Sequence, residues 1–349
     1  MAYKVHVNGP TQYRARIASE LCQAIAAVAF RRLLHGPRRP TWTRLMELST
    51  EVLKRHLSAA FQMVDVHEAR RYLDSFVLEY PVKSQVDIAP EAQHTFRGDW
   101  FTPHDTDPTL TILYFHGGGY SFYPKAYASF VALFAVTARS RTFALNYRLA
   151  PEHRFMAQLE DAVSAYKWLL ATGCRPEKIV FAGDSAGGHL ALTTLLSLRD
   201  ERMPLPAFVI ALSPATDFRN EYPSISANQP FDWIDHRMLT QWASWFCDEA
   251  QRCDARVSPL LADLRGLPPV YIQAGEAEIL FDSIQAFAER ARKQGVDVVL
   301  ESWRDMNHDF QIFGPDVPQS AEALRRMADV LDHRVRAKQQ AETLSKAHF

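Results

Sequence analysis

The sequence predicts an α/β protein whose central sheet is mostly parallel and is flanked by helices. From about residue 110 onward, short apolar runs alternate with helix-like stretches of 10–15 residues. Parallel strands need crossover connections of this length, and such connections cover both faces of a sheet. The chain has 349 residues, of which 47% are hydrophobic, so it can bury one large core as a single domain.

The first 75 residues are predicted to be mostly helical. Apolar residues recur at helical spacing within residues 11–35, and a Gly-Pro pair ends that pattern. Thr41 can cap a second helix that runs to about Leu57. Asp65 can cap a short third helix in the same way.

The remainder of the chain supplies the predicted strands and the helices that cover them. Strands are expected in the short apolar or alternating runs, and helices where apolar residues recur at helical spacing. The predicted strands are 76–82, 95–101, 110–115, 142–147, 178–182, 208–212, 270–274 and 296–303. The predicted helices are 158–170, 186–198, 283–294 and 319–335. In such sheets, reactive side chains lie beyond the carboxyl ends of the strands.

The pentapeptide Gly183-Asp184-Ser185-Ala186-Gly187 lies between a predicted strand and a predicted helix. A sharp turn in this context exposes a serine hydroxyl above the sheet, and flanking glycines allow the tight bend. The N-terminus of the following helix also favours negative charge that develops near Ser185. These features predict that Ser185 is a nucleophile.

A run of glycines, His116-Gly117-Gly118-Gly119, follows an earlier predicted strand. Ester hydrolysis passes through a negatively charged tetrahedral oxygen, and glycines bring N–H donors close to it. We assign Gly117 and Gly118 to an oxyanion hole, with Ala186 as the third donor and Gly119 as an alternative. His116 is expected to organise this loop. A phosphate-binding loop is disfavoured, because G-x-G-x-x-G and a P-loop lysine are both missing.

A serine hydroxyl needs a base that takes its proton. His308 lies in a loop after the last predicted strand, where the base belongs in the chain order serine, acid, histidine. The candidates for the acid are Glu276, Glu278 and Asp282, which follow the strand before it. Asp282 directly precedes a helix and is expected to be its N-cap. We prefer Glu278, in the strand-to-helix loop, as the carboxylate that orients His308.

At these residues the sequence resembles the hormone-sensitive-lipase-like family of α/β-hydrolase esterases. Residues 116–120 resemble the family's HGGG[FYW] motif, and residues 183–188 resemble its GDSAGG elbow. Residues 146–153 resemble its DYRLAPEH block, with Asn146 in place of the usual Asp. The resemblance implies the α/β-hydrolase fold with a mostly parallel sheet and a helical cap.

The resemblance also bears on the acid and on the domain organisation. Residues 275–282 are similar to the family's G-x-x-D-x-L-x-D motif, with Glu278 in the position of the acid. In this family the cap is built from the N-terminus and from an insertion after the sixth core strand. This implies an N-terminal cap segment at residues 1–75, a catalytic core at 76–340 and a cap insertion at about 217–250. The insertion is rich in aromatic residues, as an acyl or alcohol pocket would be.

Together these features predict a carboxylesterase with the triad Ser185, His308 and Glu278. It would act through an acyl-enzyme on short-to-medium acyl esters, of about two to eight carbon atoms, with no metal or cofactor. Amide deacylation, lactone opening and acyl transfer use the same acyl-enzyme and remain alternatives. A non-catalytic small-molecule-binding protein of the same fold is the least favoured, because all three triad positions carry competent residues.

Composition restricts the partners. The 39 basic and 40 acidic residues nearly cancel, which argues against nucleic acid. Residues 1–60 hold an excess of basic side chains, so peripheral membrane contact is a weaker alternative to a solvated helix face. No signal peptide or transmembrane segment is expected. The four cysteines are widely spaced, which indicates reduced thiols of a cytoplasmic protein: Cys22, Cys174, Cys247 and Cys253. A homodimer is also considered.

Overall fold

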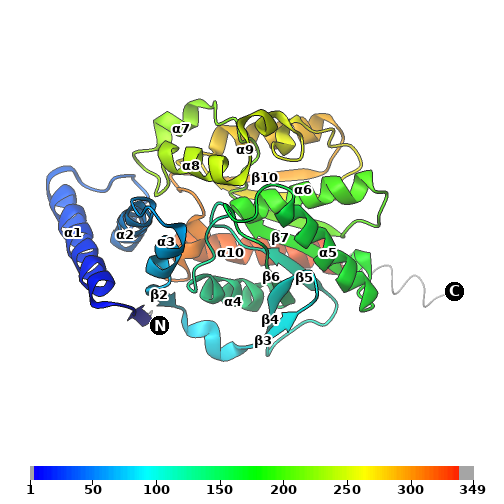
Figure 1. The fold of residues 1–349 in the computed structure, drawn as a ribbon, viewed down its shortest axis with the longest axis horizontal. Coiled ribbons are helices and arrows are strands. Elements are labelled where there is room, and N and C mark those ends of the chain that lie inside the picture. Colours follow the sequence, from blue (N-terminus) through cyan, green and yellow to red (C-terminus); the bar gives the residue numbers. More distant parts are fainter. Residues whose placement is uncertain (1–3, 338–349) are drawn as a thin grey trace.

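The computed structural model describes residues 4–337 and has an eight-stranded sheet at its centre (Figure 1). The strand order is β10-β9-β8-β7-β5-β6-β4-β3. The six strands from β5 to β10 pair in parallel, whereas β4 and β3 are antiparallel at one edge. The strands are β3 (Val86–Ala92), β4 (Arg97–Pro103), β5 (Thr111–Phe115), β6 (Arg141–Asn146), β7 (Ile179–Asp184), β8 (Phe208–Leu212), β9 (Val270–Gly275) and β10 (Val298–Trp303). The predicted mostly parallel sheet is therefore confirmed.

Helices cover the two faces of the sheet and make two cores. On β5, Ile112 and Tyr114 pack into a cluster with α4 (Tyr127–Ala138) and α10 (Pro318–Leu331). The alternate residues, Leu113 and Phe115, belong to the larger cluster on the other face. This cluster includes residues of α5 (Ala157–Ala171), α6 (Ala186–Asp200) and α9 (Phe281–Lys293). The period of two along β5 thus buries both faces of the strand.

The N-terminal segment carries helices α1, α2 and α3, which lie at one side of the molecule (Figure 1). Helix α1 (Thr11–His35) agrees with the prediction, and α3 (Val66–Leu73) begins after Asp65, whose side chain accepts from the His67 N–H. Helix α2 (Arg44–Phe61) begins later than expected, because the side chain that accepts an N–H of its first turn is Thr43 and not Thr41.

A two-stranded ribbon joins the two ends of this segment. Strand β1 (Lys4–Val7) pairs antiparallel with β2 (Phe76–Glu79), with Val5 opposite Leu78. The predicted strand at 76–82 is therefore shorter than expected and lies outside the central sheet.

The chain between β8 and β9 carries α7 (Pro223–Asn228) and α8 (His236–Phe246), and α7 contacts α9 (Figure 1). These helices fall within the expected cap insertion at about 217–250. The division into a cap segment at 1–75 and a core at 76–340 stays a prediction, and residues 1–3 and 338–340 of it lie outside the described residues. Within residues 4–337, no helix combines the length and the apolar character that a membrane span needs.

The sequence did not predict helix α4 or strand β3, and for each of them there is a physical reason. Helix α4 is almost entirely buried, so its sequence is apolar all round and has no helical period. Strand β3 is a mostly exposed edge strand that contains Pro90, a residue that usually argues against a strand. The last helix ends at Leu331, where a π-helical turn over Asp332–Arg336 replaces the expected α-helix.

Candidate active site

Ser185 occupies a strained turn between β7 and α6. Its φ is 52° and its ψ is −116°, values that a non-glycine residue rarely adopts. Gly187 follows in the first turn of α6, where a Cβ would lie 1.9 Å from the carbonyl oxygen of Phe115. The helix therefore packs against the end of β5 at a distance that only glycine allows. This packing holds the serine at the carboxyl edge of the sheet.

His308 lies in the loop after β10 and contacts this serine. Its Nε2 is 2.9 Å from the Oγ of Ser185, and the side chain is almost fully buried. The backbone of His308 is held from the inserted segment, because its carbonyl accepts from the indole N–H of Trp233 at 2.6 Å. Its N–H donates to the carboxyl of Asp232 at 3.2 Å. The segment between β8 and β9 thus fixes the position of the imidazole.

Glu278 lies on the other side of the imidazole. Its Oε2 is 3.7 Å from the Nδ1 of His308, and the carboxyl is fully buried. The same oxygen accepts a 2.5 Å hydrogen bond from the Oγ of Ser213, the residue that follows β8. Burial on its own lowers the pKa of His308, but the negative charges of neighbouring carboxyls, Asp309 and Glu278 foremost, raise it to about 9.

The other two candidates for the acid are engaged elsewhere. Glu276 is exposed at the surface. Asp282 lies inside the first turn of α9, which begins at Phe281, so the expectation that Asp282 is the N-cap was wrong. Its carboxyl accepts instead from the backbone N–H of Ser224 at 2.8 Å and ties α7 to α9.

The glycine loop lies beside the serine, and its glycines have different environments. The N–H of Gly117 donates to the buried carboxyl of Asp184 at 3.1 Å. Gly118 and Gly119 both have positive φ, and within residues 4–337 their N–H groups have no hydrogen-bond partner. A Cβ on Gly118 would lie 2.1 Å from the carbonyl oxygen of Phe122, so the loop conformation requires glycine there.

His116 is buried at the base of this loop. Its ring is stacked between Tyr123 and Tyr147, with centroid distances of 3.7 and 4.0 Å. Burial lowers the pKa of His116 to about 3, so the ring is neutral over the ordinary pH range. It does not contact Ser185, and its contacts fit a residue that organises the loop.

Several residues of the site were not predicted from the sequence. Asp184 accepts from the hydroxyls of Tyr114 and Tyr127 as well as from Gly117, and burial raises its pKa. Ser213 contacts Glu278, and the buried Asp309 follows His308 directly. Only Asp184 and Asp309 had a signal, namely their position next to a predicted site residue. Ser213 is recognised only once β8 is known to end beside the site.

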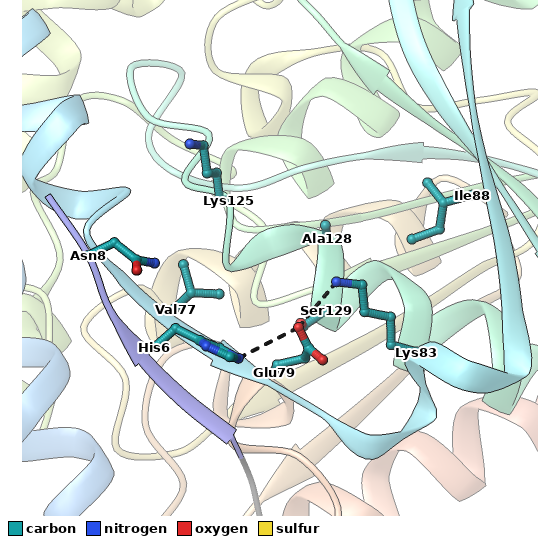
Figure 2. Close-up of a pocket in the computed structure, with 9 residues that line it drawn as sticks. All are labelled: His6, Asn8, Val77, Glu79, Lys83, Ile88, Lys125, Ala128 and Ser129. Atoms are coloured by element: carbon teal, nitrogen blue, oxygen red, sulfur yellow. Dashed lines mark hydrogen bonds and ion pairs between the residues drawn. The ribbon is translucent and has the colours of Figure 1, made fainter.

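Two cavities lie near the N-terminal ribbon. The first has a volume of about 380 Å³, includes Ser185 and His308 in its lining, and is mostly apolar. The second has a volume of about 270 Å³ and a more polar lining that includes His6, Glu79 and Lys83 (Figure 2). It contains neither Ser185 nor His308. Among the described residues, no group of three or more His, Cys, Asp or Glu side chains could hold a metal ion.

Comparisons with known proteins agree with this geometry. A family model described as alpha/beta hydrolase fold matches residues 112–312. An acetyl-hydrolase of Streptomyces hygroscopicus is 36% identical over 228 residues, which are 65% of this chain and 76% of that protein. An esterase of Acinetobacter venetianus is 30% identical over 263 residues, which are 74% and 86% of the two chains. The crystal structure of an esterase from the bacterial hormone-sensitive lipase family superposes with a TM-score of 0.72 and 30% identity, over 91% of this chain and 98% of that one.

The sheet order and the serine turn define the class of protein as an α/β hydrolase. Within this class, the chain belongs to the hormone-sensitive-lipase-like family of esterases. It is therefore a carboxylesterase of the serine hydrolase type. The predictions of fold, family and enzyme class are confirmed.

Proposed function

We propose that the protein hydrolyses acyl esters through a Ser185–His308–Glu278 triad and an acyl-enzyme. The observation that carries this proposal is the 2.9 Å distance between the Oγ of Ser185 and the Nε2 of His308, at a strained turn on the edge of the sheet. A neutral imidazole at this distance can take the serine proton as the hydroxyl attacks the ester carbonyl.

The reaction has two halves. In the first, Oγ bonds to the carbonyl carbon, His308 takes the proton, and the C–O bond to the alcohol breaks as that proton passes to the leaving alcohol. In the second, water attacks the acyl-enzyme while His308 takes the proton of the water. His308 then returns the proton to Ser185, and the acid is released.

Glu278 is proposed as the carboxylate that stabilises the imidazolium formed in each half. It approaches the nitrogen of His308 that does not face the serine, which is the arrangement this role needs. The hydrogen bond from Ser213 holds one of its oxygens in place.

For the oxyanion hole we keep Gly118 and Ala186 and replace Gly117 by Gly119. The N–H of Gly117 already donates to Asp184, which disfavours it as a donor to substrate. Ala186 is the first residue of α6, so its N–H has no partner within the helix and adds the effect of the helix dipole.

The relatives support ester substrates. One is named an acetyl-hydrolase, and another is named ethyl acetate hydrolase, from Pseudomonas putida. Short-to-medium acyl esters are the substrates that the sequence led us to expect, and p-nitrophenyl butyrate is a suitable first substrate.

The proposal is tested with Ser185→Ala. We expect kcat to fall by about 10⁴–10⁶, because the nucleophile is removed while binding is retained. Ser226→Ala, which changes an exposed serine in α7, is the matched control and should keep full activity. A fluorophosphonate should label Ser185 in the wild-type protein, seen by mass spectrometry. A Ser185→Ala variant with near-normal activity would refute the assignment.

The rival activities are separated by the acceptor and the leaving group. A p-nitroanilide of the same acyl group tests amide deacylation, a lactone tests ring opening, and added alcohol tests acyl transfer. A non-catalytic binding protein would bind esters without labelling at Ser185. The proposed partner is a small-molecule ester.

Other properties stay predictions. They are a cytoplasmic location, a homodimer and peripheral membrane contact through the basic N-terminus. Part of that basic charge is paired within the chain, since Arg32 contacts Glu47 and Arg38 lies 3.7 Å from Glu51.

A further inference from the structure

The cavity beside Ser185 extends far beyond the reacting atoms. One part of its lining comes from the active-site loops and α8, including Gly118, Gly119 and Trp242. The other part comes from the N-terminal segment, including Leu21 of α1 and Leu78 of β2. The cavity is therefore a continuous space that leads from the serine to the β1–β2 ribbon.

Helix α2 presents one face to this space. Its lining residues recur at the spacing of a helix face: Leu45, Leu48, Ser49, Val52, Leu53, His56 and Leu57. No Asp, Glu, Lys or Arg is found among the lining residues within 4–337. The wall is thus suited to an uncharged, apolar ligand.

The ribbon separates this apolar space from the polar one. Val5 and Leu78 are directly opposite each other in the ribbon, and both line the apolar cavity. Because side chains alternate along a strand, the next pair, His6 and Val77, points to the other face. Figure 2 shows His6 and Val77 on that side, together with Glu79. The alternating direction of the side chains therefore places Val5 and Leu78 together on the apolar wall.

The volume sets the size of the ligand. A methylene group occupies about as much space as a water molecule in the liquid, roughly 30 Å³. A cavity of about 380 Å³ then holds about a dozen carbon atoms. Burial of each methylene improves binding by about threefold to fourfold.

We infer that this cavity binds an unbranched alkyl chain of about ten to twelve carbons, as part of the ester substrate. The inference rests on the proposed function and goes beyond the two to eight carbons expected from the sequence. Much of the lining comes from residues between 5 and 80, which lie outside the residues 112–312 that the family model matches. We therefore expect the N-terminal segment to contribute to chain-length preference.

The experiment uses substitutions that fill part of the cavity with a larger side chain. Leu78→Trp and Leu21→Trp place a large ring in the space from two different elements. Val64→Trp is the matched control, because Val64 is fully exposed and outside the lining. We expect kcat/KM for p-nitrophenyl dodecanoate to fall at least about tenfold in the two cavity variants. The value for p-nitrophenyl butyrate should stay within about twofold in Val64→Trp and should fall much less than the dodecanoate value in the two cavity variants.

A second set of substrates shows whether the alkyl chain in the cavity belongs to the acyl part or to the alcohol part of the ester. Dodecyl acetate carries the chain on the alcohol, whereas p-nitrophenyl dodecanoate carries it on the acyl group. A selective loss on either arm supports the inference and identifies the side. Equal losses for the short and long substrates on both arms would overturn it.

A measurement on the wild-type protein covers the case in which a tryptophan variant does not fold. Dodecanoate and dodecanol should inhibit butyrate ester hydrolysis competitively, and one of them should have a Ki at least about tenfold below that of its six-carbon homologue. Equal values for the six- and twelve-carbon compounds in both series would reject the alkyl site. If the wild-type protein has no butyrate esterase activity at all, it is the proposed function that fails.

Discussion

The Oδ2 of Asp309 lies 3.2 Å from the Nε2 of His308, the nitrogen that also contacts Ser185. Within residues 4–337, neither carboxyl oxygen of Asp309 has a hydrogen-bond partner. Burial raises the pKa of Asp309 well above its usual range, and the charge of Asp184 adds to this effect. In turn the negative charges of Asp309 and Glu278 raise the pKa of His308. The two side chains are therefore close enough for the charge of each to shift the pKa of the other.

This contact predicts the pH dependence of the enzyme. In the proposed mechanism the unprotonated imidazole is the base, so we expect activity to be lost as the pH falls through the raised pKa of His308, about 9. Asp309→Asn removes one negative charge and lowers that pKa, whereas Glu278 and Asp232 still face the ring. We expect the acidic limb of the kcat/KM profile to shift to a pH about one unit lower. A larger fraction of the maximum activity then remains at pH 7.

The measurement is a kcat/KM profile between pH 5 and 10, with the rate of Ser185→Ala subtracted as the uncatalysed background. Asp282→Asn, which also changes an aspartate near the end of the sheet, should leave the limb in place. An unchanged limb in Asp309→Asn would mean that Asp309 does not control the base.

The identity of the acid is tested at Glu278. Glu278→Gln removes the charge that is proposed to stabilise the imidazolium, so we expect kcat to fall by about 10³–10⁴ with little change in the unfolding midpoint. Asp282→Asn should change kcat by less than about threefold, because its carboxyl serves only the link between α7 and α9. The opposite ranking of these two variants would transfer the role to Asp282.

The glycine loop is tested at Gly118. Gly118→Ala introduces a Cβ that would lie 2.1 Å from the carbonyl oxygen of Phe122, so the loop must shift and carry its N–H donors with it. We expect kcat to fall by about 10²–10³ while KM changes little. Gly173→Ala is a matched control, because Gly173 has the same φ of +94° but no neighbouring atom within 4 Å of a Cβ. Equal kcat values in the two variants would exclude the loop as an oxyanion hole.

Helix α3 anchors the active-site loops through Arg70. Its guanidinium donates to the carbonyls of Ser121 and Ala150 at 2.8 Å each, and it pairs with the partly exposed Glu152. Arg70→Gln should lower the free energy of unfolding by about 1–3 kcal/mol, mainly through the two carbonyl contacts. Urea denaturation measures the loss. Arg71→Gln, at the exposed neighbouring position, should cost less than about 0.5 kcal/mol, and equal costs would refute this anchor.

The elements that hold the candidate site were largely predictable from the sequence. The turn at Ser185 follows from a local pattern, since flanking glycines allow a sharp strand-to-helix turn. The strand at 208–212 was predicted with the bounds that the structure has. His308 was predicted as the base because a fixed chain order places the base after the last strand, and its Nε2 lies 2.9 Å from the Oγ of Ser185.

The remaining features depend on contacts between distant segments. Ser213 approaches Glu278, 65 residues later in the chain, and neither residue carries a local signal for the other. Asp309 directly follows His308 in the sequence, but its burial becomes evident only in the fold. The cavity depends most strongly on contacts between distant segments, because its wall combines α1, α2, β1 and β2 with the loops of the core.

The ribbon of β1 and β2 belongs to the part of the chain that lines the cavity, whereas the candidate reactive residues belong to a later part. The proposed triad lies after residue 110, whereas much of the lining of the adjacent cavity comes from residues before 81. We therefore expect substitutions in the first 80 positions to alter which esters are accepted without disturbing bond cleavage. Homologues that share the reactive centre but differ in this region are expected to divide among substrates of different length.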